Sequence, residues 1–414
     1  MKFGFKQIAL SSVMASALAA VITPAAVAQS ANNPFQRDRY TAVTERQQPD
    51  FDPEPVRAGA FLVNANAGLA AEFNDNVYAQ NSGISDTILR FTPEVDLRSN
   101  WNSHALAAGL AVNHNEHLDQ GSETSTDYNG YVDGRLDVTR TFQLTGRLNA
   151  AHVTEQRYEP GNTGTDPTQS DRLGYTAGAQ YQTDRLQLRG SVGFNQNDYD
   201  NVVGPNRDFK ETFYSGRASF AFSPDFALFV QGRTSEQDYD VSDRDGERTS
   251  YEVGASFEFA APFRGEVAIG NVSEDKVSRP DLDGLSLDAR VEWFPTQLTT
   301  VTFRGYSTVF DPGLTASASA LSTSYGVRVD HEFYRNLILF GDVGVGTYDY
   351  EGVNRTDDFS DFAAGAAWKL NKHARLEGSY RIHNTESSGD VGVIDPTRTD
   401  VSQNIFSVGI RVYP

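Results

Sequence analysis

The sequence of 414 residues contains no cysteine. This absence excludes thiol nucleophiles, cysteine zinc sites and disulfide frameworks together. It also suits a chain that crosses an oxidising compartment, where unpaired thiols would form wrong bridges. Basic residues are scarce, with 35 Lys and Arg against 55 Asp and Glu, and the formal net charge is −20. Such an acidic chain is poorly suited to bind nucleic acid, so we expect no nucleic-acid partner.

Long apolar runs are confined to the N-terminus. A signal peptide is predicted over residues 1–28. Its signs are two lysines, an apolar run from Ile8 to about Ile22 and the cleavage pattern Ala26-Val27-Ala28. No later run reaches the roughly 18 apolar residues that a membrane helix needs. Residues 29–58 are polar and contain Pro34, Pro49, Pro53 and Pro55. They predict a flexible N-terminal segment on the periplasmic side. Docking of this segment to a periplasmic partner and plugging of the lumen by it remain the alternatives.

From residue 59 to residue 414, apolar and polar side chains alternate with a period of two residues, and helical periodicity is absent. Phe406, Val408, Ile410 and Val412, for example, are separated by small or polar residues. About 18 runs of this kind can be placed, which predicts an all-β domain over residues 59–414. The breaks alternate between tight turns, such as Thr183-Asp184, and longer polar segments such as 156–171. This pattern is typical of an antiparallel up-and-down transmembrane β-barrel with short periplasmic turns and longer outer loops.

Aromatic residues support two membrane interfaces. Those in the outward phase near the short turns predict a girdle, since aromatic side chains concentrate at the boundary between hydrocarbon and water. Its members are Trp101, Phe142, Tyr181, Phe222, Phe259, Phe263, Trp293 and Trp368. A second group, which includes Tyr175 and Tyr251, lies near the longer loops. We therefore expect the cell outer membrane as the location, with outer-membrane lipids, lipopolysaccharide and the barrel assembly machinery as partners.

The inward phase predicts an arginine-rich lumen. The lumen-lining arginines are Arg90, Arg98, Arg135, Arg147, Arg189, Arg217, Arg233, Arg264, Arg290, Arg304, Arg328, Arg375, Arg381 and Arg411. Two interpretations stay open. The arginines could attract small anionic solutes, because rings of basic charge favour anions. They could instead pair with Asp and Glu across strands in a lumen that is polar because it is wet.

No motif indicates catalysis, a cofactor or a metal. His114 and His117 have a spacing found in metal sites, but residues three apart on a strand point to opposite faces. The seven histidines are scattered and no serine lies in a nucleophile elbow. We therefore expect no enzyme activity, no cofactor and no metal site.

Long stretches of the chain resemble the second family of putative outer-membrane β-barrel porins. The resemblance is carried by TERQQPDFDPEPVRAGAFLVNANAGLAAEFNDNVYA, by VEWFPTQLTTVTFRGYSTVFDP and by VDHEFYRNLILFGDVGVGTYDYEGVNRTDDFSDFAAGAAWKL. Many members are encoded beside genes for exopolysaccharide or capsule synthesis and export. The resemblance implies a passive conduit in exopolysaccharide secretion, with polysaccharide as cargo and periplasmic export components as partners. A general diffusion porin for small solutes and a structural barrel with a closed lumen remain the alternatives.

Overall fold

The computed structural model describes residues 35, 39–162, 164–259, 262–390 and 399–414. The predicted signal peptide, residues 1–28, lies outside the described residues, as do residues 29–34 and 36–38. No helix in the described ranges is long and apolar enough to cross a membrane.

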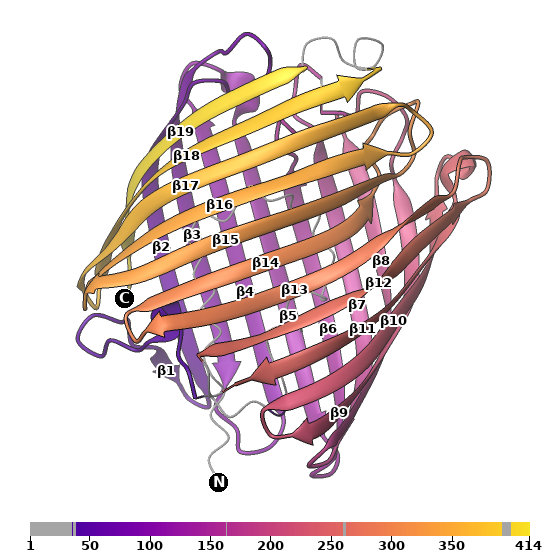
Figure 1. The fold of residues 1–414 in the computed structure, drawn as a ribbon. Helices are drawn as coiled ribbons and strands as arrows, with labels where there is room; N and C mark the ends of the chain where they lie inside the picture. The colour runs from indigo at the N-terminus through magenta and orange to yellow at the C-terminus, as the bar shows by residue number, and fades with distance from the viewer. Residues whose placement is uncertain (1–34, 36–38, 163, 260–261, 391–398) are drawn as a thin grey trace.

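The fold is a closed antiparallel β-barrel of 18 strands, β2 to β19, as predicted (Figure 1). Each strand pairs with the next along the chain, and β19 pairs with β2 to close the ring. Closure is required of a membrane sheet because an open edge would leave backbone groups unpaired in hydrocarbon. A short extra strand, β1 (Val56–Ala58), pairs with the start of β2. The barrel strands are β2 (Phe61–Asn74), β3 (Asp86–Ser99), β4 (Ala105–His117), β5 (Ser125–Asp137), β6 (Phe142–Thr154), β7 (Gln169–Gln182), β8 (Leu186–Asp200), β9 (Phe209–Ser223), β10 (Phe226–Tyr239), β11 (Gly246–Glu258), β12 (Phe263–Lys276), β13 (Leu282–Thr296), β14 (Thr299–Phe310), β15 (Ala320–Tyr334), β16 (Leu337–Tyr350), β17 (Arg355–Asn371), β18 (Ala374–Gly389) and β19 (Asp400–Val412).

The two ends of the barrel differ in their connections. Short turns join strands at one end, where the short strand β1 and the C-terminus also lie (Figure 1). The longer loops are at the other end, and two of them contain a single 3-10 turn, η2 (Gly121–Glu123) and η3 (Ser242–Arg244). Following the expected topology of outer-membrane barrels, we call these the periplasmic and outer ends.

Several strands extend further toward the outer end than the sequence predicts. β7 begins at Gln169, β11 at Gly246 and β17 at Arg355, whereas the alternation of hydrophobicity begins at 172, 249 and 358. The added residues are mostly polar on both faces, so they do not alternate. Their backbone groups still join the ladder, as in the pairing of Arg355 with Gly389. Hydrophobic alternation therefore reports the lipid-facing band and not the full strand.

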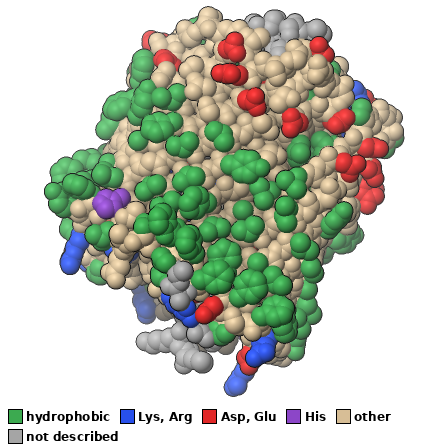
Figure 2. Space-filling view, viewed as in Figure 1, with side chains coloured by type: hydrophobic (Ala, Val, Ile, Leu, Met, Phe, Trp, Pro, Cys, Tyr) green, Lys and Arg blue, Asp and Glu red, His purple; other side chains and the backbone are tan. Residues whose placement is uncertain are grey.

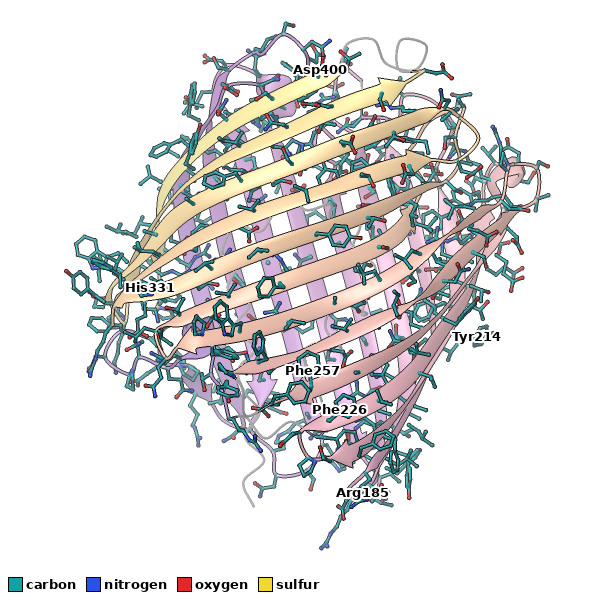
Figure 3. All side chains as sticks on the ribbon, in the orientation of Figure 1. Arg185, Tyr214, Phe226, Phe257, His331 and Asp400 are labelled. Carbon is teal, nitrogen blue, oxygen red and sulfur yellow. The ribbon has the colours of Figure 1, made fainter. Side chains whose placement is uncertain are left out.

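The outer surface carries the apolar half of the alternation. Leu69, Leu110, Val253 and Val343 are among many large side chains that are at least half exposed. In Figure 2 such side chains form a broad band, with acidic side chains gathered toward the outer loops and basic ones toward the short turns. Figure 3 places Asp400 and Arg185 at these opposite ends. The band supplies the lipid-facing surface that a barrel in a bilayer needs.

The predicted girdle residues lie on this outer surface beside the short turns. Trp101, Tyr181, Phe222, Phe259, Trp293 and Trp368 are exposed, and Phe142 and Phe263 are half-buried. Neighbouring rings support one another, as in the stacking of Phe263 on Trp293 with centroids 6.1 Å apart. Phe333 and Tyr334, beside the turn that joins β15 and β16, are also exposed and in mutual contact.

Inside the barrel, aromatic rings fill space over glycines of adjacent strands. The Phe213 ring on β9 occupies the position where a Cβ on Gly193 of β8 would lie, and Phe229 on β10 does the same at Gly254 of β11. The rings therefore pack flat against the wall and leave the centre of the lumen to polar side chains.

Candidate functional site: the lumen and its two mouths

The predicted lumen-lining arginines all occupy the phase opposite to the exposed apolar side chains. Arg90, for example, lies between the exposed Leu89 and Phe91, and Arg411 lies between the exposed Ile410 and Val412. Because successive side chains on a strand point to opposite faces, these arginines project into the barrel. The structure thus places these arginines on the inner face of the wall, and their role as a pore lining stays a prediction.

Most of these arginines are neutralised by a carboxylate. Arg217 on β9 forms two hydrogen bonds of 2.7 Å with Glu266 on β12, and Arg304 on β14 contacts Asp342 on β16 at 2.7 Å. Such charge-assisted, bidentate contacts orient the guanidinium as well as neutralise it. The other pairs are Arg90–Glu72, Arg135–Asp137, Arg147–Asp133, Arg233–Glu211, Arg264–Glu292, Arg290–Glu292, Arg328–Asp330, Arg375–Glu377 and Arg411–Glu377.

Three arginines outside this list, Arg98, Arg189 and Arg381, differ in their surroundings, and so does one paired arginine, Arg290. Arg98 and Arg381 interact with neighbouring groups. Arg189 donates to the side-chain oxygen of Gln180 at 3.0 Å and lies opposite Arg217 in the ladder. The side chain of Arg290 is 51% exposed and shares Glu292 with Arg264. A lumen with these contacts is polar and nearly balanced in charge, and Arg290 is the most solvent-exposed of its paired arginines.

The loop between β6 and β7, residues 155–168, folds inward at the outer mouth. Arg157 holds it in place through two hydrogen bonds to Glu123, of 2.7 and 2.5 Å, and through bonds to the carbonyls of Gly164 and Thr165. Asn162, fully buried, donates to the carbonyl of Glu155 and accepts from the Thr168 amide. These contacts satisfy the backbone of an irregular segment that lies inside the barrel.

The tip of this loop reaches distant parts of the wall. The Tyr158 ring packs on His383 of β18, with centroids 4.3 Å apart. Gly161 (φ +80°) lies against the loop between β14 and β15, where an added Cβ would sit 2.7 Å from the Pro312 carbonyl. Because β6 and β14 lie on nearly opposite sides of the ring, the two loops meet across the outer mouth.

The second loop, residues 311–319, is held by three arginines from further loops, of which Arg279 donates to the Thr315 carbonyl at 3.2 Å. Arg244 donates to both carboxylate oxygens of Asp311 (2.6 and 2.5 Å) and to the Leu314 carbonyl. Arg207 bridges the two inward loops, since it donates to Glu155 at 3.0 Å and to the Asp311 carbonyl at 3.2 Å. Leu314 also packs in an apolar cluster inside the barrel that includes Tyr348, Tyr350 and Phe359.

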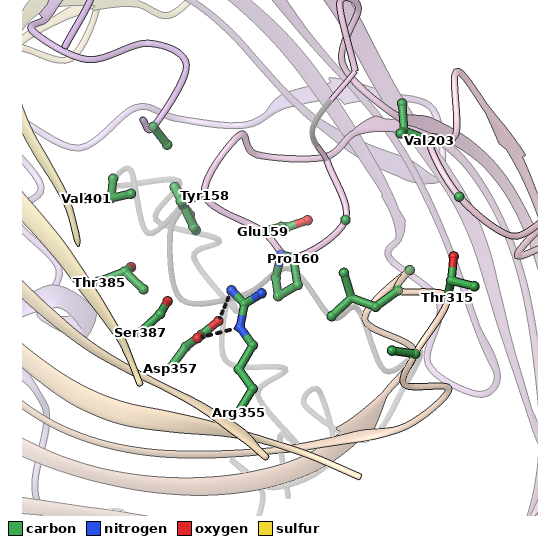
Figure 4. Close-up of a pocket in the computed structure, with 16 residues that line it drawn as sticks. Tyr158, Glu159, Pro160, Val203, Thr315, Arg355, Asp357, Thr385, Ser387 and Val401 are labelled. Carbon is green, nitrogen blue, oxygen red and sulfur yellow. Dashed lines mark hydrogen bonds and ion pairs between the residues drawn. The ribbon is translucent and has the colours of Figure 1, made fainter. Parts of the chain in front are cut away.

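Two cavities flank the loop 155–168. The larger, of about 300 Å³, is lined on the outer side by Glu159, Pro160, Thr315, Thr385 and the ion pair of Arg355 with Asp357 (Figure 4). The smaller, of about 140 Å³, lies among side chains of the lumen wall. Tyr158 lines both cavities. Tyr158 and its loop therefore lie between the larger cavity, at the outer mouth, and the smaller cavity, in the lumen wall.

One acid in this loop has an altered protonation equilibrium. Burial and the nearby charge of Glu155 raise the pKa of Glu159 to about 8, although Arg172 and Arg207 act in the opposite direction. Burial works to lower the pKa of Arg207, but the charges of Glu155 and Asp311 outweigh it and raise that pKa above its usual range. Near neutral pH, Glu159 is thus largely uncharged, and the inward loop avoids placing two carboxylates close together.

The N-terminal segment narrows the periplasmic mouth. Residues 39–58 lie along the inner rim, with contacts from Asp225 beside β10 to Lys372 in the turn between β17 and β18, and end in β1. Tyr40 stacks on Phe294 with centroids 5.1 Å apart, and its carbonyl accepts a hydrogen bond from Arg264. Val43 is buried, and its amide donates to Thr300 at 3.0 Å. The further ion pairs with the rim are Arg39–Asp225, Glu45–Arg264, Arg46–Glu332, Asp52–Lys369 and Glu54–Lys372. Residues 39–58 of the segment predicted to be flexible are therefore anchored to the barrel.

Sequence reasoning did not single out the residues that shape the mouths. The predicted loops contain Arg157, Asn162, Arg207 and Arg244. The three arginines share one sequence signal, namely their position inside an otherwise acidic loop. His114 and His117 lie apart as expected for one strand, with His114 bonded to Thr126 and His117 to Asp86. Within the described ranges, no group of three His, Asp or Glu side chains could hold a metal ion.

Comparisons with known proteins agree with the fold. The family described as "Putative beta-barrel porin 2" matches residues 48–413. The crystal structure of OccK1 (OpdK) from Pseudomonas aeruginosa is similar at 10% identity, with 85% of this chain and 99% of that chain covered and a TM-score of 0.50. OccK2 (OpdF) from the same organism is similar at 12% identity, with 85% and 98% covered and a TM-score of 0.50. Among curated proteins, none matches this sequence.

Proposed function

This chain belongs to the Putative beta-barrel porin 2 family and forms an outer-membrane β-barrel pore, and on that premise we propose that it is a passive channel for small hydrophilic solutes. The observation that carries the proposal is the contact of the loop 155–168 with the loop 311–319 across the outer mouth. Two loops that meet inside a wide barrel obstruct part of the outer mouth, which disfavours wide cargo. The porin fold of the similar OccK1 and OccK2 structures is compatible with this function.

The predicted role in exopolysaccharide secretion gains no support from the comparisons. A polymer that threads the lumen would need the inward loops and the anchored N-terminal segment to move aside together. That movement would break the buried contacts of Arg157 with Glu123 and of Arg244 with Asp311. It would also break the hydrogen bonds from these two arginines to the carbonyls of Gly164, Thr165 and Leu314, so these contacts together oppose spontaneous opening. We therefore favour small solutes over a polymer as the cargo.

The test is single-channel conductance of the purified full-length protein in a planar bilayer, combined with swelling of liposomes in solutions of neutral sugars of increasing size. We expect a stable open channel and uptake that falls off steeply with sugar size. A variant in which residues 158–166 are replaced by a two-residue Gly-Ser link should conduct more and admit larger sugars. A second variant keeps the length but replaces the same residues with Gly and Ser, and its current should fluctuate because the loop loses its anchors.

Three outcomes would count against the proposal. Absence of conductance in both the natural chain and the shortened variant would indicate a structural barrel with a closed lumen. Equal conductance in all variants would show that the inward loops do not limit passage. Uptake of long dextrans by the natural chain would favour the polymer conduit instead. Migration of the unheated protein as a folded barrel in electrophoresis controls for correct assembly in each case.

A further inference from the structure

Strands β13 and β14 separate in their outer parts. Their ladder ends at the pair Asp288–Tyr306. Beyond this pair, residues 282–287 of β13 remain in the ladder with β12, and residues 307–310 of β14 remain in the ladder with β15. We call the junction of these two stretches the seam. Because no strand pairing crosses it, the seam needs another source of cohesion than the hydrogen bonds that join the neighbouring strands.

Apolar side chains hold the seam closed. Leu282 of β13 and Val309 of β14 are buried in one cluster with Val272 of β12, and Leu321 of β15 packs against this cluster. Leu321 also reaches β13 directly, since a Cβ added to Gly284 would lie 2.7 Å from its Cδ2 atom. Apolar packing is non-directional, so a hydrocarbon chain can take the place of these contacts, which it cannot do in a hydrogen-bonded ladder.

On its outer side, the seam meets the upper margin of the apolar band. Leu285, in the unpaired part of β13, points outward and is 45% exposed. The next outward residue toward the outer end is Asp283, which is also exposed, so the band ends within the seam. Water and lipid headgroups at this level can satisfy backbone groups that hydrocarbon would leave unpaired. A hydrocarbon chain of the outer leaflet can therefore reach the seam without crossing a polar surface.

On its lumen side, the seam ends beside two carboxylates without a cationic partner. Asp288, the last paired residue of β13, points inward, is half-buried and forms no hydrogen bond or ion pair with another described residue. Its carboxylate oxygens are accessible from the lumen. Glu252 of β11 accepts hydrogen bonds from two neutral groups, the Ser286 hydroxyl at 2.5 Å and the Gln231 side chain. Ser286 lies two residues from Asp288 on the same face, so the two carboxylates are neighbours.

The guanidinium groups nearby are engaged elsewhere. Arg290 lies two residues beyond Asp288 but bonds to Glu292 at 2.9 Å. Arg217 forms its two hydrogen bonds with Glu266. The inner end of the seam is therefore a place where a cation is favoured, and where an anion would meet two uncompensated negative charges.

We propose that the seam binds an amphipathic cation, with the alkyl chain between β13 and β14 and the ammonium group on Asp288 and Glu252. The apolar cluster and the two carboxylates lie in the order that such a molecule requires, with the chain toward the outer leaflet and the charge toward the lumen. The inference goes beyond the proposed function, because this ligand enters the barrel sideways from the bilayer and not through a mouth.

The measurement is photo-crosslinking of the full-length barrel in phosphatidylcholine nanodiscs. The probe is decylammonium that carries a diazirine near the end of its chain, and mass spectrometry locates the products. We expect saturable cross-links in the seam, at residues 282–287 and 307–310 and at Leu321. Unlabelled decylammonium should compete, whereas decanoate, which has the opposite charge, and methylammonium, which lacks the chain, should not.

Variants of Asp288 separate the charge from the chain. Asp288→Asn should raise the half-saturating probe concentration about five- to tenfold, as expected for loss of a partly screened ion pair. Asp288→Glu keeps the charge and should restore most of the affinity. Asp198→Asn is the matched control, because Asp198 is exposed at the outer end of β8, away from the seam. Val309→Phe should reduce cross-linking by filling the seam, and migration as a folded barrel in electrophoresis checks each variant.

Cross-links spread evenly over the apolar band would overturn the inference, because the probe would then only be dissolved in the bilayer. Competition by decanoate equal to that by decylammonium would overturn it as well, and so would equal saturation of Asp288→Asn and Asp198→Asn. Failure of the channel is recognised separately. A barrel that binds the probe in the seam but passes no current contradicts the proposed function and not the site.

Discussion

Arg264 on β12 donates from Nη2 to a carboxylate oxygen of Glu45 at 2.8 Å, although the two residues are 219 positions apart in the chain. The same guanidinium also bonds to Glu292 of β13 and to the carbonyl of Tyr40. One wall residue thus ties the N-terminal segment to two neighbouring strands at the periplasmic mouth.

Glu45→Ala should loosen the N-terminal segment. The Glu45 side chain is 43% exposed, so solvent screening limits the loss to about 1 kcal/mol or less. Cleavage by trypsin after Arg46, followed by mass spectrometry on the detergent-solubilised barrel, should accelerate severalfold. Glu54→Gln is the control, because its pair with Lys372 is exposed and should contribute little. Equal acceleration in both variants would mean that Arg264 does not anchor the segment.

Arg157→Ala should release the loop 155–168 from the wall. The change leaves Glu123 buried without its counter-charge, which costs about 3–5 kcal/mol when a buried pair is broken. We expect a larger and more variable single-channel conductance. Arg140→Ala, in an exposed periplasmic turn, should conduct like the natural chain. A conductance of Arg157→Ala that matches this control would argue that the loop does not narrow the passage.

Alkaline pH should destabilise the inward loop through Glu159. Its pKa is raised to about 8 in the folded protein, so the folded state holds more protons than the unfolded state between about pH 4.5 and pH 8. The stability of the closed loop must therefore fall as pH rises through this window and level off above pH 8. Channel recordings from pH 6 to pH 9 should show more frequent transitions to larger conductance at high pH. Glu159→Gln should remove this dependence, and its persistence in that variant would assign it to another group.

Ion selectivity should be weak and should depend on Arg290. Most lumen arginines are paired with carboxylates, whereas the Arg290 side chain is 51% exposed and shares its acidic partner. Under a tenfold gradient of KCl, we expect a small reversal potential with the sign of anion preference. Arg290→Gln should move it toward zero or toward cation preference. A strong anion preference that survives this change would favour the alternative of an arginine-lined anion channel.

Gly193→Ala should destabilise the barrel through the aromatic packing of its inner wall. An added Cβ would lie 2.3 Å from the Phe213 ring and 2.9 Å from the Tyr175 carbonyl. Forced overpacking of this kind costs about 1–3 kcal/mol. Urea unfolding in lipid vesicles, monitored by tryptophan fluorescence, should show the loss. Gly146→Ala is the matched control, because nothing lies within 4 Å of its added Cβ. Equal midpoints for the two variants would show that Phe213 moves aside freely.

The number of strands, their order and the direction of their side chains could be predicted from the sequence. A bilayer allows only closed sheets among β structures, and its apolar band imposes outward alternation on every strand. The alternation alone therefore places Arg90, Arg217 and Arg411 inside the barrel. Strand ends were less predictable, because residues beyond the band, such as Thr356 and Asp357, pair without alternating in polarity.

The partners of these residues were decided only by the tertiary structure. Arg217 meets Glu266 three strands away, and Arg157 meets Glu123 from another loop, because strand tilt and stagger set which side chains come level inside the barrel. The inward course of the loop 155–168 and the anchored N-terminal segment depend on the same long-range contacts. By itself, the sequence determined a polar-lined barrel, since the two-residue period needs only local geometry. The closed ring decided how that lumen is narrowed, since it brings opposite walls within reach of each other.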